Sequence, residues 1–299
     1  MKHKIKNIEA SVRSRLKKIA QDSGRNFEAV LLQYFQERFL YRLSISPYKE
    51  NFILKGALLF LAYEIPRSRP TKDIDFLGKS LSNTSDCIIY AMKEILEVSV
   101  QDGLRFDLDS LIYEVIKQDA DYKGIRLFCN AYLGSAFIRL HFDIGFGDIV
   151  IPQPVILDFP VLLSDSPVPE LIAYTPESAI AEKFEAIVNL GLITSRMKDF
   201  FDIYYLSEHK TFKSETLTKA IKETFKRRNT KLSNRITIYQ DEFKYNENKQ
   251  IQWKAFLRRQ MNYAEITFFD CIDKINEFIE PIILSDDFKT WNPNDRKWI

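Results

Sequence analysis

The segment 137–146 places the strictest constraint on how this chain folds. Its apolar residues occupy every second position, at Ile138, Leu140, Phe142, Ile144 and Phe146. The residues between them include Arg139, His141 and Asp143. Side chains of a β-strand point alternately to opposite faces, so a strict period of two predicts a strand with one buried face. The chain therefore contains a sheet, and Asp143 lies on its polar face.

Helical segments flank a central run of strands. Apolar residues recur at helical spacing after Asn26 and after Thr175-Pro176, and Asn26 and Thr175 are both good N-caps. Strands are predicted at 73–77, 111–117, 125–132, 137–146 and 155–157. This order predicts an α+β fold and not a series of βαβ units. We expect three parts, namely an N-terminal helical segment at 1–50, an α/β core at 51–163 and a C-terminal helical domain at 164–299.

Composition and cysteine spacing exclude several classes of protein. Hydrophobic residues make up 45% and charged residues 28% of the 299 residues, as in globular proteins. The three cysteines are far apart and form no CxxC pair, which argues against a disulfide framework or a zinc knuckle. The first long apolar stretch, 57–63, is too short to span a bilayer. We expect a cytoplasmic protein without a membrane partner.

Charge is distributed unevenly along the chain. The net charge is only +2, yet basic residues cluster in 1–20 and in 210–260. Two basic ends around a more acidic middle are consistent with a polyanionic partner such as RNA. Solvated helix surfaces would give the same pattern, so charge alone does not decide between the two interpretations.

The sequence Asp73-Ile74-Asp75 lies in a predicted strand, so both carboxylates point to one face. Two adjacent carboxylates repel each other unless a cation lies between them, and oxygen ligands favour Mg²⁺. A lone DxD is more often a pair of exposed acids at a strand end. If strand 137–146 is the neighbour, Asp143 completes a three-carboxylate cluster. Such a cluster can hold two Mg²⁺ ions that clamp a triphosphate.

A glycine precedes the paired aspartates. Lys55-Gly56-Ala57 opens a predicted apolar helix at 56–64, and a glycine at a helix start lets a phosphate approach the backbone N–H groups. The order of glycine-led helix, DxD strand and third-Asp strand resembles the DNA polymerase β-like nucleotidyltransferase superfamily. The match narrows to the AbiEii/AbiGii family, which includes MenT-type toxins. It rests on LKGALLFLAY, Arg69 to Asp75, and the later motifs AEKFEA at 181–186 and SRMKDFFD at 195–202.

The resemblance implies a polymerase β-like mixed sheet and a role for each matching residue. Its metal ligands, for Mg²⁺ or Mn²⁺, would be Asp73, Asp75 and Asp143. Its nucleotide-binding residues would be Lys55, Gly56, Arg69, Thr71, Lys183, Arg196 and Lys198. The catalytic residues implied by the resemblance are these three aspartates together with Lys183 and Asp199. Ala57 stands where relatives usually carry a second Gly or a Ser, which removes one possible contact to the triphosphate.

The later motifs also permit a purely structural interpretation. Lys183 lies beside the apolar stripe of its predicted helix, so its stem can pack while its ammonium group reaches a cleft or the solvent. Asp199 and Asp202 are three residues apart on the next helix and are near neighbours there. An ion-pair network within the helix pair is the main alternative to catalysis.

The resemblance implies a Mg²⁺-dependent nucleotidyltransferase that moves a nucleoside monophosphate from an NTP to an acceptor and releases pyrophosphate. It suggests the toxin of a type IV-like toxin–antitoxin, or abortive infection, pair with a separately encoded antitoxin. MenT-like relatives modify the 3′ end of tRNA, so tRNA is the expected acceptor. One alternative is a protein acceptor, as in AMP-transferring enzymes. The other is a non-catalytic RNA- or protein-binding relative, against which Asp75, Asp143 and Lys183 argue.

Overall fold

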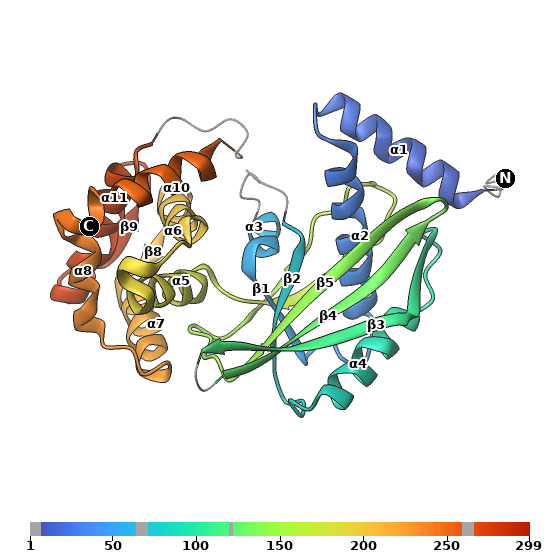
Figure 1. Cartoon of the computed structure of the whole chain (residues 1–299), viewed down its shortest axis with the longest axis horizontal. Helices are drawn as coiled ribbons and strands as arrows, with labels where there is room; N and C mark the ends of the chain where they lie inside the picture. The colour runs from blue at the N-terminus through green and yellow to red at the C-terminus, as the bar shows by residue number, and fades with distance from the viewer. Residues whose placement is uncertain (1–6, 64–70, 120–121, 259–265) are drawn as a thin grey trace. The chain divides into compact units, whose positions relative to one another are not determined.

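The computed structural model of the chain describes residues 7–63, 71–119, 122–258 and 266–299. The chain forms two compact units (Figure 1). The first unit consists of Met1–Gly147 and Val155–Ala173, and the second of Asp148–Pro154 and Tyr174–Ile299. Each unit combines helices with a sheet, which confirms the α+β fold class.

A seven-stranded mixed sheet forms the centre of the first unit, with the strand order β3-β4-β5-β2-β1-β7-β6. The pairs β2–β5 and β1–β7 are parallel, and the other neighbours are antiparallel. The strands are β1 (Phe52–Lys55), β2 (Asp73–Gly78), β3 (Leu104–Asp119), β4 (Tyr122–Leu133), β5 (Ala136–Phe146), β6 (Val155–Asp158) and β7 (Glu170–Ala173). The four-residue strands β1 and β7 lie in the interior of the sheet, and the sequence pattern did not reveal them.

Helices α2 (Phe27–Ser44) and α4 (Ser85–Glu97) pack on one face of this sheet and contact each other, and α1 (Ile8–Asp22) packs on α2 (Figure 1). The 3₁₀ turn η1 (Gly56–Leu58) follows β1 and contacts β2, and the short helix α3 (Leu59–Ala62) follows this turn. Asn26 caps α2 as predicted, because its side chain accepts the N–H groups of Glu28 and Ala29. The ring of Phe39 on α2 lies 4.5 Å from that of Phe142 on β5. The apolar face of β5 is therefore the core face, and Asp143 lies on the opposite face.

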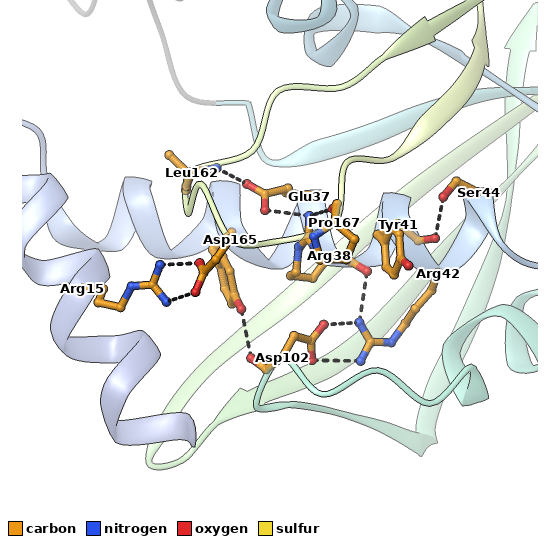
Figure 2. A network of polar contacts seen from close by, with 11 residues as sticks. Arg15, Glu37, Arg38, Tyr41, Arg42, Ser44, Asp102, Leu162, Asp165 and Pro167 are labelled. Carbon is orange, nitrogen blue, oxygen red and sulfur yellow. Dashed lines mark hydrogen bonds and ion pairs between the residues drawn. The ribbon is translucent and has the colours of Figure 1, made fainter. Parts of the chain in front are cut away.

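Helix α2 also carries a polar network that holds the segment between β6 and β7 (Figure 2). Glu37 accepts the backbone N–H of Leu162 at 2.7 Å, and Arg38 donates to the carbonyl of Pro167 at 2.8 Å. Burial raises the pKa of Glu37 to about 7, although the adjacent Arg38 opposes that rise. Further ion pairs in the network join Arg15 to Asp165 and Arg42 to Asp102.

The second unit is mainly helical. Its helices are α5 (Pro176–Leu190), α6 (Met197–His209), α7 (Ser214–Arg227), α8 (Ile236–Tyr239), α9 (Asp241–Lys244), α10 (Glu247–Leu257) and α11 (Phe268–Leu284), with the 3₁₀ turns η2 (Gly191–Ile193) and η3 (Leu232–Arg235). A small antiparallel sheet contains β8 (Phe212–Lys213), β9 (Thr290–Asn292) and β10 (Lys297–Trp298). Thr175 caps α5 ahead of Pro176, as predicted.

The C-terminal tail docks onto the helices of the second unit through two tryptophans. The indole N–H of Trp291 donates to the carbonyl of Ser207 at 2.7 Å, and that of Trp298 donates to the carbonyl of Phe278 at 2.8 Å. Both indole rings are buried, and each satisfies its polar group within the protein. The two indole rings therefore fix the C-terminal tail on the helices of the second unit.

Candidate active site

The aspartates of β2 and β5 lie next to each other in the first unit. The two strands are parallel neighbours, and Asp75 is aligned with Asp143 while Asp73 is aligned with His141. Aligned residues on adjacent strands share a face of the sheet, so all three carboxylates lie on the face opposite the Phe39 contact. The adjacency that the sequence left open is therefore present.

Gly56 provides the space that Asp75 occupies. Its backbone has a φ of +71°, and a Cβ atom there would lie 2.0 Å from Oδ2 of Asp75. Lys55 at the end of β1 is the antiparallel partner of Asp75, which explains this close approach. The helix expected at 56–64 is shorter in the structure, which has a 3₁₀ turn and then the four-residue α3. The turn thus allows a carboxylate to lie against the backbone of the chain.

Basic side chains hold two of the three carboxylates. Arg126 on β4 makes a bidentate contact with Asp143, with Nε–Oδ1 and Nη2–Oδ2 distances of 2.7 Å each. This contact raises the pKa of Arg126. His141 Nδ1 lies 3.4 Å from Asp73. Sequence reasoning missed Arg126, because its alignment with Asp143 follows from the β4–β5 register.

A hydrogen bond from helix α2 fixes the segment that leads into β2. The buried side chain of Gln36 donates to the carbonyl of Thr71 at 2.9 Å, and the Thr71 hydroxyl lies 3.5 Å from the carbonyl of Asp73. Thr71 and Lys55 are both buried, with 6% and 8% exposure. Arg69 lies outside the described residues. Gln36 therefore positions the segment that leads into the DxD strand, and nothing in the sequence distinguishes it from the other polar residues of α2.

The later motifs form an ion-pair cluster in the second unit. Lys183 on α5 contacts Asp199 at 3.1 Å and Asp202 at 2.6 Å, both on α6. Burial alone would lower the pKa of Lys183, but Asp202 and Asp199 outweigh it and raise that pKa. Burial would raise the pKa of Asp199, but Lys183 reverses the effect and lowers it. Arg196 reaches Asp199 at 3.5 Å, and the side chain of Lys198 is exposed.

Part of the basic stretch 210–260 is used within the second unit. Arg228 pairs with Asp148 at 2.9 Å and with Glu185 at 3.0 Å, and Arg235 pairs with Glu280 at 2.8 Å. The side chains of Arg228 and Arg235 are only 14% and 11% exposed. Arg228 therefore neutralises two buried acids and Arg235 a half-buried one, so the basic surface of this stretch is smaller than its sequence indicates.

Comparison with known proteins identifies the class of protein that this fold and site define. The model of the family "Nucleotidyl transferase AbiEii toxin, Type IV TA system" matches residues 38–274. The chain belongs to this family, and it is a nucleotidyltransferase of a toxin family that uses NTP. The match includes β1, the aspartates of β2 and β5, and the Lys183 cluster.

Two comparisons with solved structures have TM-scores below 0.5. JHP933 from Helicobacter pylori is 14% identical, with a TM-score of 0.46 and coverage of 86% of this chain and 95% of that chain. A structure described as that of a candidate nucleotidyltransferase from H. pylori is 13% identical, with a TM-score of 0.42 and coverage of 86% and 98%. No curated protein sequence matches this chain. Within the described residues, no helix is long and apolar enough to cross a membrane.

The side chains of β2 and β5 suit the divalent ion that nucleotidyltransferases generally use. Asp73, Asp75 and Asp143 offer hard carboxylate oxygens on one face of two adjacent strands. As they stand, no three His, Cys, Asp or Glu side chains among the described residues converge on one point. Arg126 and His141 hold Asp143 and Asp73, so these carboxylates would exchange their basic partners for the ion.

Proposed function

We propose that this protein is a Mg²⁺-dependent nucleotidyltransferase toxin that transfers a nucleoside monophosphate from an NTP to the 3′ end of tRNA. The observation that carries the proposal is the alignment of Asp75 with Asp143 on parallel neighbouring strands, with Asp73 on the same face. Family membership supports the reaction class. The tRNA acceptor rests on the resemblance to MenT-type toxins.

In the proposed reaction, the acceptor hydroxyl oxygen forms a bond to the α-phosphorus of the NTP. The bond from that phosphorus to the oxygen bridging to the β-phosphate breaks, and pyrophosphate leaves. Mg²⁺ held by Asp73, Asp75 and Asp143 would neutralise phosphate charge and lower the pKa of the attacking hydroxyl. Asp143 is also the candidate acceptor for the proton of that hydroxyl.

Other residues are proposed to bind the nucleotide. Lys55 and Gly56 precede α3, and Gly56 lies against the Asp75 carboxylate, so both are close to the proposed metal ligands. Thr71 and Arg69 precede the DxD strand in sequence. The family motifs in the second unit add Lys183, Arg196, Lys198 and Asp199 to the proposed nucleotide-binding and catalytic residues. The buried Lys183–Asp199 contact is consistent with either a catalytic or a structural role, and these roles predict different results for the variants discussed below.

A labelling experiment tests this function. Purified protein is incubated with total tRNA, Mg²⁺ and each α-labelled NTP in turn, beside Asp75→Asn and the control Asp109→Asn. Asp109 is an exposed residue of β3 in the same sheet. We expect label at tRNA 3′ ends that is lost in Asp75→Asn and kept in Asp109→Asn. Label on protein would refute the tRNA acceptor, and equal labelling by Asp75→Asn would refute the proposed site.

The proposed partner is an antitoxin encoded separately from this chain, as the type IV family implies. Co-expression with the adjacent candidate gene tests this pairing. Growth inhibition by the toxin alone, relieved by the second gene, is the expected result. Unrelieved inhibition would contradict the pairing, while the labelling experiment would still test the enzymatic activity.

A further inference from the structure

The polar face of strands β4 and β5 carries a row of rings and guanidinium groups that ends at the aspartates. Four cross-strand pairs follow one another from the aspartates outward, namely Asp143–Arg126, His141–Phe128, Arg139–Asn130 and Phe137–Tyr132. Aligned pairs of an antiparallel ladder share a face, and successive pairs on that face are about 6.8 Å apart. The row from Asp143 to Phe137 is therefore about 20 Å long.

The side chains of this row contact one another. The rings of Phe128 and His141 are 4.8 Å apart, and the guanidinium of Arg139 lies 4.5 Å from the Phe128 ring centroid. Farther out, the Tyr132 and Phe137 rings are 5.4 Å apart. Arg105 on β3 lies 4.3 Å from the Tyr132 ring centroid. Aromatic rings and arginine side chains thus alternate along this face of the sheet.

Several of these groups are available to a ligand. The side chain of Phe137 is 52% exposed, which is high for a phenylalanine, and Arg139 and Arg105 are exposed. Among the described residues, neither Arg139 nor Arg105 takes part in an ion pair. Two acids of the neighbouring strand β3 lie beside the row, since Asp107 is aligned with Asn130 and Glu114 with Arg126. The β4–β5 row therefore presents exposed rings and positive charge beside the proposed metal ligands.

Basic helix α1 lies beyond the outer end of the row. Arg13 donates to the hydroxyl of Ser135, in the turn between β4 and β5, at 2.8 Å. Lys17 and Lys18 on the same helix are exposed. Figure 1 shows α1 beginning beside this end of β4 and β5. A polyanion that leaves the row at Phe137 would thus meet further positive charge.

We propose that this row binds the single-stranded 3′-terminal segment of the RNA acceptor, with its last nucleotide at the aspartates. This inference rests on the proposed function and names the surface that would deliver the acceptor. Unpaired bases stack on aromatic rings and on guanidinium planes, while arginines hold the phosphates. The row suits a segment on the order of four nucleotides, at the low end of known site sizes. A duplex cannot use it, because its bases are already stacked and paired.

Continuity with the aspartates favours RNA over a protein partner. Rings and arginines are also common in protein interfaces. However, β5 carries Asp143 and Phe137 on the same face, so a strand that stacks on the row runs directly toward the reacting atoms. Binding of a protein partner would not require this alignment of Phe137 with Asp143.

Fluorescence anisotropy tests the proposal without catalysis. A labelled twelve-nucleotide single-stranded RNA and a duplex of equal length are titrated with the full-length protein in EDTA and without NTP. The variants are Phe137→Ala and Arg139→Ala. The matched control is Tyr113→Ala, since Tyr113 is an aromatic residue that is 45% exposed and aligned with the core-facing Leu127 on the other face of the sheet. Thermal melts check that each variant is folded.

Phe137→Ala should weaken binding of the single strand about 5- to 150-fold, the range expected for loss of one stacking ring. Arg139→Ala should lower the slope of log K against log salt by about 0.7. Tyr113→Ala should bind like the wild type, and neither ring variant should alter duplex binding. Wild-type affinity in folded Phe137→Ala would overturn the proposal, as would an equal loss in Tyr113→Ala. If Phe137→Ala binds RNA like the wild type but no longer binds the co-expressed antitoxin, the row is a binding surface for the antitoxin and not for RNA.

The two proposals fail in different ways. If Phe137→Ala binds single-stranded RNA like the wild type and still labels tRNA fully, the surface is wrong and the function stands. If the wild type binds single-stranded RNA through Phe137 but transfers no nucleotide to tRNA, the surface stands and the tRNA acceptor is wrong.

Discussion

Replacement of Lys183 by Met removes the ammonium group that contacts both Asp199 and Asp202. The stem of the side chain is kept, but two carboxylates that are 5% and 6% exposed lose their common counter-charge. Removal of one partner of a buried ion pair costs about 3–5 kcal/mol. Lys183 itself is 14% exposed, so we expect the lower end, about 3 kcal/mol. The unfolding temperature of the second unit should then fall by roughly 6–12 °C.

The pH dependence of this loss identifies its cause. In the wild type, the pKa of Asp199 lies below its ordinary value, so its contribution to stability is present above about pH 4 and is lost as the pH falls through the lowered pKa. In Lys183→Met, burial raises the pKa of Asp199, because only Arg196, at 3.5 Å, and the exposed Lys198 remain to oppose it. The variant should therefore lose stability as the pH rises above about 4, and its deficit should be larger at pH 8 than at pH 5.

Urea unfolding of both proteins at pH 5 and pH 8 measures this effect. The triple variant Lys183→Met, Asp199→Asn, Asp202→Asn removes the uncompensated charges and should recover most of the stability. If the triple variant is stable but inactive, the cluster has a role in nucleotide transfer in addition to its structural one. A Lys183→Met protein within about 1 kcal/mol of the wild type at both pH values would refute the reasoning.

Three further predictions concern the first unit. Arg126→Gln should bind Mn²⁺ roughly tenfold more tightly than the wild type, because a nearby unit charge repels a divalent ion by about 1–2 kcal/mol even in water. Isothermal titration calorimetry measures this affinity, and unchanged or weaker binding would show that Arg126 does not compete for Asp143. Burial raises the pKa of Glu37 to about 7, so between about pH 4.5 and 7 the folded protein keeps a proton that the unfolded chain has lost. Wild-type stability should fall over that window by up to about 3 kcal/mol relative to Glu37→Gln, and parallel stability curves would contradict this. Gly56→Ala should abolish transfer, because its Cβ would lie 2.0 Å from Asp75 Oδ2, while wild-type activity in this variant would show that Asp75 moves without loss.

Local signals were sufficient where one short segment determines the structure. The strict alternation in 137–146 predicted β5 and its polar face, and Asn26 and Thr175 predicted the starts of α2 and α5. These features depend on side-chain period and on capping, which are visible within a few residues. They were sufficient for the fold class and for the face on which Asp143 lies.

Strands β1 and β7 were missed for a physical reason. All four residues of β1 are buried, so this strand has no alternation, and it runs directly into the apolar turn that precedes α3. Strand β7 also has only four residues. A short apolar run inside a sheet cannot be distinguished from a buried helical segment by periodicity. Strand β3 begins at Leu104, before the predicted residue 111, with a register shift between Asp107 and Ile112.

The pairing of site residues could not be predicted, because it depends on register between segments distant in sequence. Asp143 meets Arg126 through the β4–β5 alignment and Asp75 through the β2–β5 alignment. A shift of one residue would place either partner on the opposite face. The contact of Lys183 with Asp202 likewise depends on how α5 packs against α6.

The central claim is that Asp73, Asp75 and Asp143 form the metal site for nucleotidyl transfer, and calorimetric titration of Mn²⁺ tests it most directly. The titration is performed with a non-hydrolysable NTP analogue on the wild type, Asp75→Asn, Asp143→Asn and the control Asp109→Asn. We predict a saturable site in the wild type and in Asp109→Asn, with affinity reduced at least tenfold in the other two variants. Wild-type Mn²⁺ affinity in both Asp75→Asn and Asp143→Asn would contradict the claim.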